Sequence, residues 1–398
     1  MNAFFGTDNS MASTIFIAVF WFATASLFYV YAGYPLLLAL FGLVASKKRR
    51  PGDSLPTVSV LISAYNEEAS IERKVRATLS LDYPEDKLEV VVVSDGSTDK
   101  TDTIVLSLRE PRVRLLRIEG RRGKTNAQNH AVKICRGEVI VFSDATAVYQ
   151  QESIRRLAAH YSDSKVAAVS GRYRYFEPEC ESPSGLGSIA FWDYENLIKW
   201  LQNRLGTLTG CSGCIYSVRR ASYVPLPDEA CSDLVEPLNL VRNGYRVAFE
   251  PRALAYEETT VNTGQEWRMR VRVATRGMRG VLSVPELLNP FRRPWPAFQL
   301  FSHKILRWLA PVFLAMLFIA SAGLMSTPAY LLLFLAQAVF YGFALVSLAF
   351  PIHKAWKPLA IPQYFCTLNA AFLAGLLEVA RGRKYTTWQT VRNTPQLP

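Results

Sequence analysis

The stretch Gly137 to Thr146, GEVIVFSDAT, decides the fold of this chain. Val139 to Phe142 is a continuous run of β-branched and aromatic residues, which is typical of a strand in a parallel sheet that is buried on both faces. The run leads to Asp144, in the loop that follows. Because ligands of open α/β sheets bind beyond the carboxyl ends of the strands, Asp144 is placed to meet a metal ion or a nucleotide. The alternative is that Asp144 caps the next helix, which is expected near Gln151.

Two earlier strands end in similar polar residues. Val58 to Ser63, VSVLIS, is followed by Ala64 to Glu68, AYNEE, which we expect to open a helix that runs through Leu79. Acidic residues in a first helical turn also suit the helix dipole, so capping is the alternative role. Leu88 to Ser94, LEVVVVS, ends in Asp95 to Asp99, DGSTD. Two strand-to-helix turns of this kind predict a Rossmann-like α/β half.

A glycine-rich basic loop follows the next predicted strand. After Val113 to Ile118 comes Gly120 to Asn129, GRRGKTNAQN, which opens a helix. Such a loop can hold phosphate through its backbone N–H groups and Lys124.

Apolar stretches at both ends of the chain predict a membrane protein. Of the 398 residues, 50% are hydrophobic, and they concentrate in Ile15 to Ala45 and from Ile305 onward. Both stretches exceed the ~20 residues that span a bilayer. Ile15 to Ala45 is expected to be one long helix, because Gly33-Tyr34-Pro35 offers weak turn chemistry for a hairpin. It carries no signature of a cleavable signal.

The basic residues predict the orientation. Lys47 to Arg50 directly follow the first apolar stretch, and the positive-inside rule puts the polar domain behind them in the cytoplasm. We therefore expect a multi-pass protein of the cell (inner) membrane. The net charge of +12 fits anionic lipid headgroups as partners more simply than nucleic acid, which we do not expect to bind.

The C-terminal region is predicted to hold a helical hairpin and a further segment. Ile305 to Met325 and Tyr330 to Phe350 form the hairpin, and Lys354 with Lys357 return it to the cytoplasm. Leu359 to Ala380 contains Pro, Gln, Thr and Asn, and fits a re-entrant or interfacial segment. The expected division is a membrane anchor at 1–50, a cytoplasmic domain at 51–290 and a membrane region at 291–398.

The cysteines indicate no disulfide framework. The chain has six, and a cytoplasmic domain keeps thiols reduced. Cys211 and Cys214 form a CxxC motif without a second pair at ligand spacing, so structural zinc remains only an alternative.

Four motifs, each at a strand end, together resemble one protein family. They are Ala64-Tyr65-Asn66-Glu67, Asp95-Gly96-Ser97-Thr98-Asp99, Gly123-Lys124 with Asn129, and the Asp144 loop. As a set they look like the nucleotide-sugar half of inverting family 2 glycosyltransferases, with cellulose synthase-like, polysaccharide-synthesising relatives. The resemblance implies an α/β fold of the GT-A type, in which a Rossmann-like mixed sheet is flanked by helices, with N- and C-terminal transmembrane helices.

The second half of the chain extends the resemblance. Gly210 to Arg220 is similar to the acceptor-side stretch, and Ser232-Asp233-Leu234 resembles the segment that carries the catalytic base. Ser302 to Trp308 resembles a membrane-entry segment. The resemblance implies that Asp233 is the base, that Asp144 binds Mg²⁺ or Mn²⁺, and that a further set binds the nucleotide sugar, expected to be a UDP-sugar. That set is Tyr65, Glu67, Asp95, Lys124, Asn129, Asp144, Arg270, Arg272 and Arg276.

The sequence departs from the family pattern in three ways. Thr146 stands where the metal motif has its second carboxylate, and Ser232 replaces an acidic residue before the base. Met269 and Val273 replace the Gln and Trp of processive members, so we expect one or a few sugars per encounter.

Three functions are compatible with these motifs. The first is transfer of a sugar to a lipid-linked or growing polysaccharide acceptor, which Asp233 favours, because a hydroxyl acceptor needs a general base. The second is charging of a polyprenyl phosphate with one sugar. The third is a non-catalytic membrane scaffold, which the loss of the second metal carboxylate keeps open. For Asp233 the alternative is a helix cap, and for the arginines it is a solvated or lipid-facing helix surface.

Overall fold

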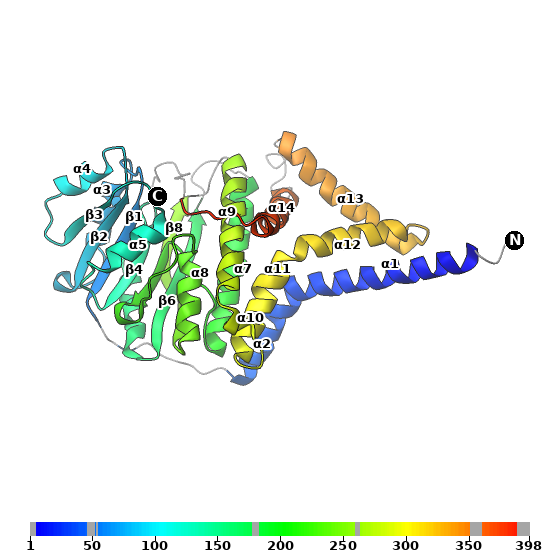
Figure 1. Cartoon of the computed structure of the whole chain (residues 1–398), viewed down its shortest axis with the longest axis horizontal. Helices are drawn as coiled ribbons and strands as arrows, with labels where there is room; N and C mark the ends of the chain where they lie inside the picture. The colour runs from blue at the N-terminus through cyan, green and yellow to red at the C-terminus, as the bar shows by residue number, and fades with distance from the viewer. Residues whose placement is uncertain are drawn as a thin grey trace.

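The polar part of the chain folds around one eight-stranded sheet, with the strand order β3-β2-β1-β4-β7-β6-β8-β5 (Figure 1). The computed structural model describes residues 5–45, 52, 55–176, 183–258, 263–350 and 360–387. The strands are β1 (Val58–Ala64), β2 (Leu88–Asp95), β3 (Val113–Ile118), β4 (Val139–Asp144), β5 (Val148–Tyr149), β6 (Val166–Phe176), β7 (Ile215–Arg219) and β8 (Arg246–Glu258).

The first four of these strands form a parallel half-sheet. β1 pairs with β2 and β4, and β2 pairs with β3, all in parallel. Their carboxyl ends therefore meet at one edge, where Ser63 of β1 is in register with Asp144 of β4. This confirms the predicted strands and the position of Asp144 at the ligand-binding edge of an α/β sheet.

The other half of the sheet is mixed. β7 lies antiparallel between β4 and β6, and β8 runs parallel to β6. The short strand β5 pairs antiparallel with β8, so that Val148 lies opposite Tyr256 and Tyr149 opposite Ala255. The chain that leaves Asp144 is thereby led along the end of β8.

Helices cover both faces of the sheet. One face packs on α3 (Ile71–Leu79), α4 (Thr101–Ser107) and α6 (Ser153–Ala158), and the other on α5 (Lys124–Val132), α8 (Ser232–Arg242) and α9 (Thr263–Leu282). In β2, Val90 and Val92 enter the first core and Val91 and Val93 the second. Each such side chain stabilises the fold by about 1.5–3 kcal/mol, which explains the uninterrupted apolar run.

One predicted helix start is wrong. Residues 65–70 form a loop, and α3 begins only at Ile71. Asn66 has a φ of 54°, which a right-handed helix does not allow. Its side-chain oxygen accepts a hydrogen bond of 2.8 Å from the backbone N–H of Thr98. The β1 loop is therefore tied to the β2 loop instead of entering a helix.

Several long apolar helices extend away from the sheet (Figure 1). α1 (Phe5–Phe28), a π-helical turn at Tyr29–Gly33 and α2 (Tyr34–Ala45) follow one another without a break, which confirms one helix instead of a hairpin. α12 (Ala310–Gly323) and α13 (Pro328–Ala349) form the predicted hairpin, and α14 (Ala360–Ala380) is a continuous helix.

Within the described residues, three helices are long and apolar enough to cross a membrane. They are Met11–Val44, Pro328–Leu348 and Ala360–Ala380. Pro294–Trp308 and Ala310–Gly323 would be a fourth if this pair, bent by 54°, were one span. The basic groups Lys47 to Arg50 and Lys354 with Lys357 lie outside the described residues, and the re-entrant or interfacial placement of α14 stays a prediction.

The apolar helices pack closely on the polar domain. On α7 (Pro183–Leu205), Ile198 and Leu201 contact Tyr34 and Leu38 of α2. On α9, Ala274 and Met278 pack against Tyr364, Leu368 and Phe372 of α14. Leu300, at the end of α10 (Pro294–Leu300), is buried in the same core as the residues of α8. The expected boundary at residue 290 remains a prediction, and packing is continuous across it.

Short helical segments complete the described chain. They are the 3₁₀ turns Glu85–Lys87, Ala159–Ser162, Arg220–Ser222 and Pro285–Leu288, the π-helical turn Phe301–Ile305 and the short helix α11 (Leu306–Trp308).

Candidate active site

A cleft opens beyond the carboxyl edge of the parallel strands. It encloses about 1350 Å³ including its open mouth, and residues of β1, β4, β6, β8, α5, α7, α8 and α9 line it. The cleft brings together seven residues that the sequence analysis selected. They are Glu67, Lys124, Asp144, Asp233, Arg270, Arg272 and Arg276.

Asp144 and Lys124 form an ion pair in this cleft. Asp144 ends β4, whereas the next helix, α6, has Glu152 at its N-cap, so Asp144 is not a helix cap. Burial lowers the pKa of Lys124, but the charge and the hydrogen bond of Asp144 and the charges of Asp233 and Glu257 together outweigh burial and raise this pKa overall. The lysine therefore stays charged, and this part of the cleft holds a fixed cation beside a carboxylate.

Asp95 shapes the glycine-rich loop instead of lining the cleft. Its fully buried carboxylate accepts hydrogen bonds of 2.9 Å from the backbone N–H groups of Arg122 and Gly123. Gly123 precedes α5 with a φ of 102°, a conformation that L side chains rarely adopt. Asp95 thus fixes the backbone that presents Lys124.

The chain that follows α14 returns to this loop, as the red trace in Figure 1 shows. A Cβ atom placed on Gly123 would lie 2.2 Å from the carbonyl oxygen of Thr386, so only glycine fits beneath this segment. Lys384 donates a hydrogen bond of 2.5 Å to Glu229 in the loop that precedes α8. Residues 384–386 therefore contact two loops that border the cleft.

Asp233 lies in the first turn of α8. The N-cap of α8 is Cys231, so the alternative role of Asp233 as a cap is wrong. Its Oδ1 accepts a hydrogen bond from the Cys231 thiol at 3.0 Å, and Gly213 packs so closely that a Cβ there would lie 2.8 Å from Oδ2. The carbonyl of Asp233 also accepts a 2.8 Å bond from Cys211 N–H. The stretch Gly210 to Arg220, which contains the CxxC motif, therefore positions the Asp233 carboxylate.

Two arginines of α9, Arg270 and Arg276, have different surroundings. The Arg270 Nε donates 2.7 Å to Glu266, and its Nη2 donates 3.2 Å to Ser188 Oγ. Arg276 instead binds the carbonyls of Glu229 and Ala230 and the Thr125 hydroxyl. Arg276 thereby joins the loop before Asp233 to α5.

Two other predicted residues do not line the cleft. The Asn129 amide donates 2.7 Å to Leu226 O, and its oxygen accepts bonds of 3.0 Å from Leu226 N–H and 2.8 Å from the Tyr223 hydroxyl. Asn129 therefore holds a neighbouring loop. The Tyr65 ring is covered by the guanidinium of Arg121, 4.0 Å from its centre.

Glu257, a buried carboxylate at the end of β8, is not among the residues predicted from the sequence. It is 1% exposed and lines the cleft. It accepts hydrogen bonds of 2.9 Å from Thr146 Oγ1 and 2.6 Å from the Tyr173 hydroxyl. The rule that functional carboxylates follow strands would have indicated it, had the strand before Tyr256-Glu257-Glu258 been recognised.

Three aromatic side chains on another wall of the cleft were also not predicted from the sequence. Tyr173 and Tyr175 of β6 and Trp192 of α7 line it. The rings of Tyr173 and Trp192 lie edge to face with their centres 4.6 Å apart. Among the described residues, the buried Nε1 of Trp192 has no hydrogen-bond partner. Aromatic side chains on a cleft wall offer a face on which a sugar ring can pack.

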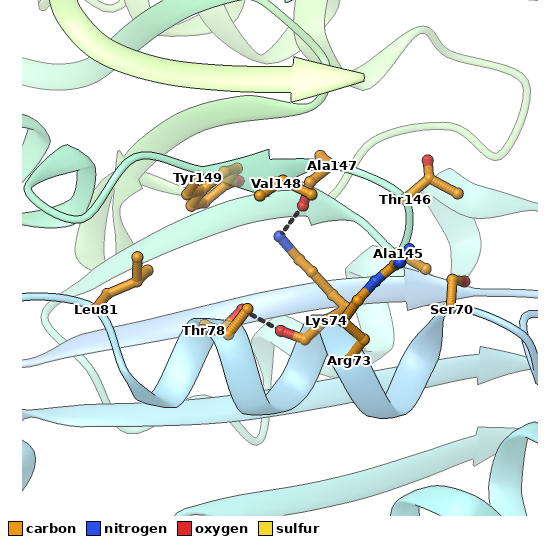
Figure 2. A pocket seen from close by; sticks show the side chains of 11 residues that line it. Ser70, Arg73, Lys74, Thr78, Leu81, Ala145, Thr146, Ala147, Val148 and Tyr149 are labelled. Atoms are coloured by element: carbon orange, nitrogen blue, oxygen red, sulfur yellow. Dashed lines mark hydrogen bonds between the residues drawn. The ribbon is translucent and has the colours of Figure 1, made fainter. Parts of the chain in front are cut away.

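Lys74 binds the loop that follows Asp144. Figure 2 shows its side chain reaching from α3 to the carbonyl oxygen of Ala147, to which it donates a hydrogen bond of 2.6 Å. Burial lowers the pKa of this ammonium to about 8. It thus remains mostly protonated at neutral pH, and it anchors the backbone between Asp144 and β5.

The comparisons with known proteins agree with this geometry. Residues 59–223 match the family described as glycosyl transferase family 2. The chain has a TM-score of 0.70 to the mannosyltransferase PcManGT from Pyrobaculum calidifontis, solved in complex with GDP-Man and Mn²⁺, with 22% identity over 94% of this chain and 99% of that one. The fold is therefore GT-A, and the match to family 2 glycosyltransferases covers residues 59–223.

Two curated relatives are similar over a large part of the chain. The poly-beta-1,6-N-acetyl-D-glucosamine synthase of Staphylococcus aureus (strain COL) is 26% identical over 61% of this chain and 64% of its own length. The probable glycosyltransferase YdaM of Bacillus subtilis (strain 168) is 28% identical over 64% of this chain and 63% of its own length. The matches thus span just under two thirds of these relatives.

Proposed function

We propose that this chain transfers a sugar, with inversion, from a nucleoside diphosphate sugar to a hydroxyl of a lipid-linked or growing polysaccharide acceptor. We expect the donor to be a UDP-sugar. One observation carries the proposal: Asp233 of α8 lines the same cleft as the Asp144–Lys124 pair. Inverting transfer needs these two functions in one cleft, a base for the acceptor and positive charge for the departing diphosphate.

Asp233 is the proposed general base. Inversion is a single displacement at the anomeric carbon, in which the acceptor hydroxyl loses its proton as its oxygen forms the new bond. The contacts from Cys231 and Gly213 fix the carboxylate, which reduces the freedom it would lose in the transition state.

The donor is proposed to bind on the α5 and α9 walls. Lys124, Arg270 and Arg272 would contact the diphosphate, with Glu67 near the nucleoside. Asp95 and Arg276 act on these contacts indirectly, because they hold the loops that present Lys124 and Asp233.

The donor set of the cleft fits a divalent ion. Mg²⁺ and Mn²⁺ prefer hard oxygen ligands, and Mg²⁺ is commonly held by one or two carboxylates together with substrate phosphates. Asp144 supplies such a carboxylate at a half-buried position, with 27% of its side chain exposed. When bound, the ion would stabilise the negative charge of the leaving diphosphate.

The acceptor is proposed to arrive from the membrane. α9, which lines the cleft, packs directly on α14, and Trp308 at the start of the apolar hairpin contacts Gly277 of α9. A lipid-linked glycan at headgroup level would therefore reach the cleft. We propose a multi-pass protein of the cell inner membrane that contacts its lipids, with the catalytic domain in the cytoplasm.

The test uses the purified full chain in detergent with membrane lipid extract and radiolabelled UDP-, GDP- and dTDP-sugars. We expect one label to enter lipid or polymer. Asp233→Asn should lower the transfer rate ~10²- to 10⁴-fold, while the affinity for the nucleoside diphosphate, measured by calorimetry, stays near the wild-type value. Near-normal transfer by the Asn variant would remove Asp233 from the mechanism. Label on a polyprenyl phosphate alone would support the other transferase, and no transfer from any donor would support the scaffold.

A further inference from the structure

The cleft contains a carboxylate beside the position where the metal motif lacks one. Asp144-Ala145-Thr146 offers a hydroxyl at its third position. We propose that Glu257 is the second protein carboxylate of the divalent-ion site and that it acts together with Asp144. This inference rests on the proposed function, since it concerns the ion that the sugar donor would bring into the same cleft.

The sheet topology brings Glu257 to this place. β5 begins four residues after Asp144, and its pairing puts Val148 opposite Tyr256. The turn between β4 and β5 therefore runs past the next residue of β8, which is Glu257. The hydrogen bond of 2.9 Å from Thr146 Oγ1 to Glu257 Oε1 closes this contact. A residue 111 positions further along the chain thus stands beside the hydroxyl that occupies the motif.

The electrostatics of the site point in the same direction. Burying a carboxylate costs free energy unless a charge or a metal ion compensates it. Glu257 is almost fully buried and lines the same cleft as the half-buried Asp144. A divalent cation near both carboxylates would offset part of this burial cost.

The ligand chemistry is also suitable. Two carboxylates, diphosphate oxygens and water make a hard oxygen set of the kind that Mg²⁺ and Mn²⁺ take. Thr146 has a positioning role in this arrangement, because its hydroxyl orients the Glu257 carboxylate while Tyr173 holds the other oxygen. A site built from two distant strands would leave no two-carboxylate motif in the sequence.

The experiment measures Mn²⁺ binding to the full chain in detergent by electron paramagnetic resonance. Binding is measured with UDP and without it, and no sugar donor or acceptor is added. Glu257→Gln keeps the shape of the side chain but removes its charge, and we expect it to weaken Mn²⁺ binding on the order of tenfold or more. Asp144→Asn should have a comparable effect. The control Glu236→Gln makes the same change at a buried carboxylate of α8 that does not line the cleft, so its Mn²⁺ affinity should stay near the wild-type value.

A second variant separates ligation from folding. Glu257→Asp retains the charge on a shorter side chain and should bind Mn²⁺ more tightly than Glu257→Gln. Wild-type Mn²⁺ affinity in Glu257→Gln would overturn the inference, and so would equal losses in the Gln and Asp variants with a lowered midpoint of thermal unfolding. Failure of the proposed function looks different: Mn²⁺ binding would depend on both carboxylates, but no sugar would be transferred.

Discussion

The ammonium nitrogen of Lys74 lies 2.6 Å from the carbonyl oxygen of Ala147 and 3.9 Å from the centre of the Tyr149 ring. A buried cation thus binds the backbone of the β4–β5 turn (Figure 2). The turn carries Asp144 at one end and Thr146 in the middle. Its shape therefore depends on a residue that does not line the cleft.

Lys74→Met should loosen this turn. We expect the affinity for UDP with Mn²⁺ to fall by about tenfold, because loss of a buried charge-assisted hydrogen bond costs about 1.5–3 kcal/mol and part of this loss falls on the site. Calorimetry measures the affinity. Arg76→Met is the matched control, since it removes an exposed cation of the same helix that pairs with Glu72. Equal losses in both variants would contradict the positioning role.

Gly123 and Gly120 form a natural pair for testing the glycine-rich loop. Both have positive φ values, 102° and 72°, but only at Gly123 would a Cβ collide, with Thr386. Backbone strain alone costs of order 1–3 kcal/mol. Gly120→Ala should therefore weaken UDP binding modestly and Gly123→Ala severely. If calorimetry gave the two variants the same affinity, the contact with residues 384–386 would have no bearing on the loop.

Trp192 is expected to hold the acceptor. Trp192→Ala should raise the acceptor KM up to about tenfold and shorten any polymer, because an aromatic contact is worth about 0.5–1.5 kcal/mol beyond its area. Trp200→Ala, an exposed tryptophan of the same helix outside the cleft, is the control. Product length by mass spectrometry also tests the expectation from Met269 and Val273 of one or a few additions. If Trp192→Ala still made long products, another surface of the protein would have to hold the growing glycan.

Glu236 makes the stability of the protein depend on pH. It is fully buried in α8, and burial raises the pKa of its carboxyl from 4.5 to about 8. Between pH 4.5 and about pH 8, the Glu236 carboxyl keeps a proton in the folded protein but releases it in the unfolded chain. The contribution of Glu236 to the free energy of unfolding is therefore highest below about pH 4.5 and falls as the pH rises through about 8. The slope is at most about 1.4 kcal/mol per pH unit.

Glu236→Gln should remove this dependence. The midpoint of thermal unfolding of the variant, followed in detergent from pH 5 to pH 9, is expected to exceed the wild-type midpoint at the alkaline end by the largest margin. A constant difference between variant and wild type at every pH would mean that the carboxyl does not titrate in this range.

The local pattern of the sequence predicted the parallel strands and Asp144 well. Val58–Ala64, Leu88–Asp95 and Val139–Asp144 are buried on both faces, and this double burial leaves an uninterrupted apolar run. Asp233 has no such local signal. It came only from the resemblance, since an acidic residue in a first helical turn is equally suited to the helix dipole.

The residues that were missed depend on tertiary pairing. Glu257 reaches the cleft because β5 pairs with β8, and Trp192 because α7 packs beside β6. Neither relationship has a periodicity that a sequence displays. Asn129 was predicted to bind the nucleotide sugar because it lies in the glycine-rich motif. In the structure its side-chain amide instead binds the loop at Leu226, which is distant in sequence.

The close approach of Thr386 to Gly123 has a consequence for biosynthesis. The glycine-rich loop is made early and emerges from the ribosome long before residues 384–386, which follow the last apolar helix. The native surroundings of this loop can therefore form only after the membrane segments have been inserted and translation has passed them. In a nascent or wrongly inserted chain the loop would lack this contact, so the proposed nucleotide-sugar site would stay incomplete until the membrane segments are in place.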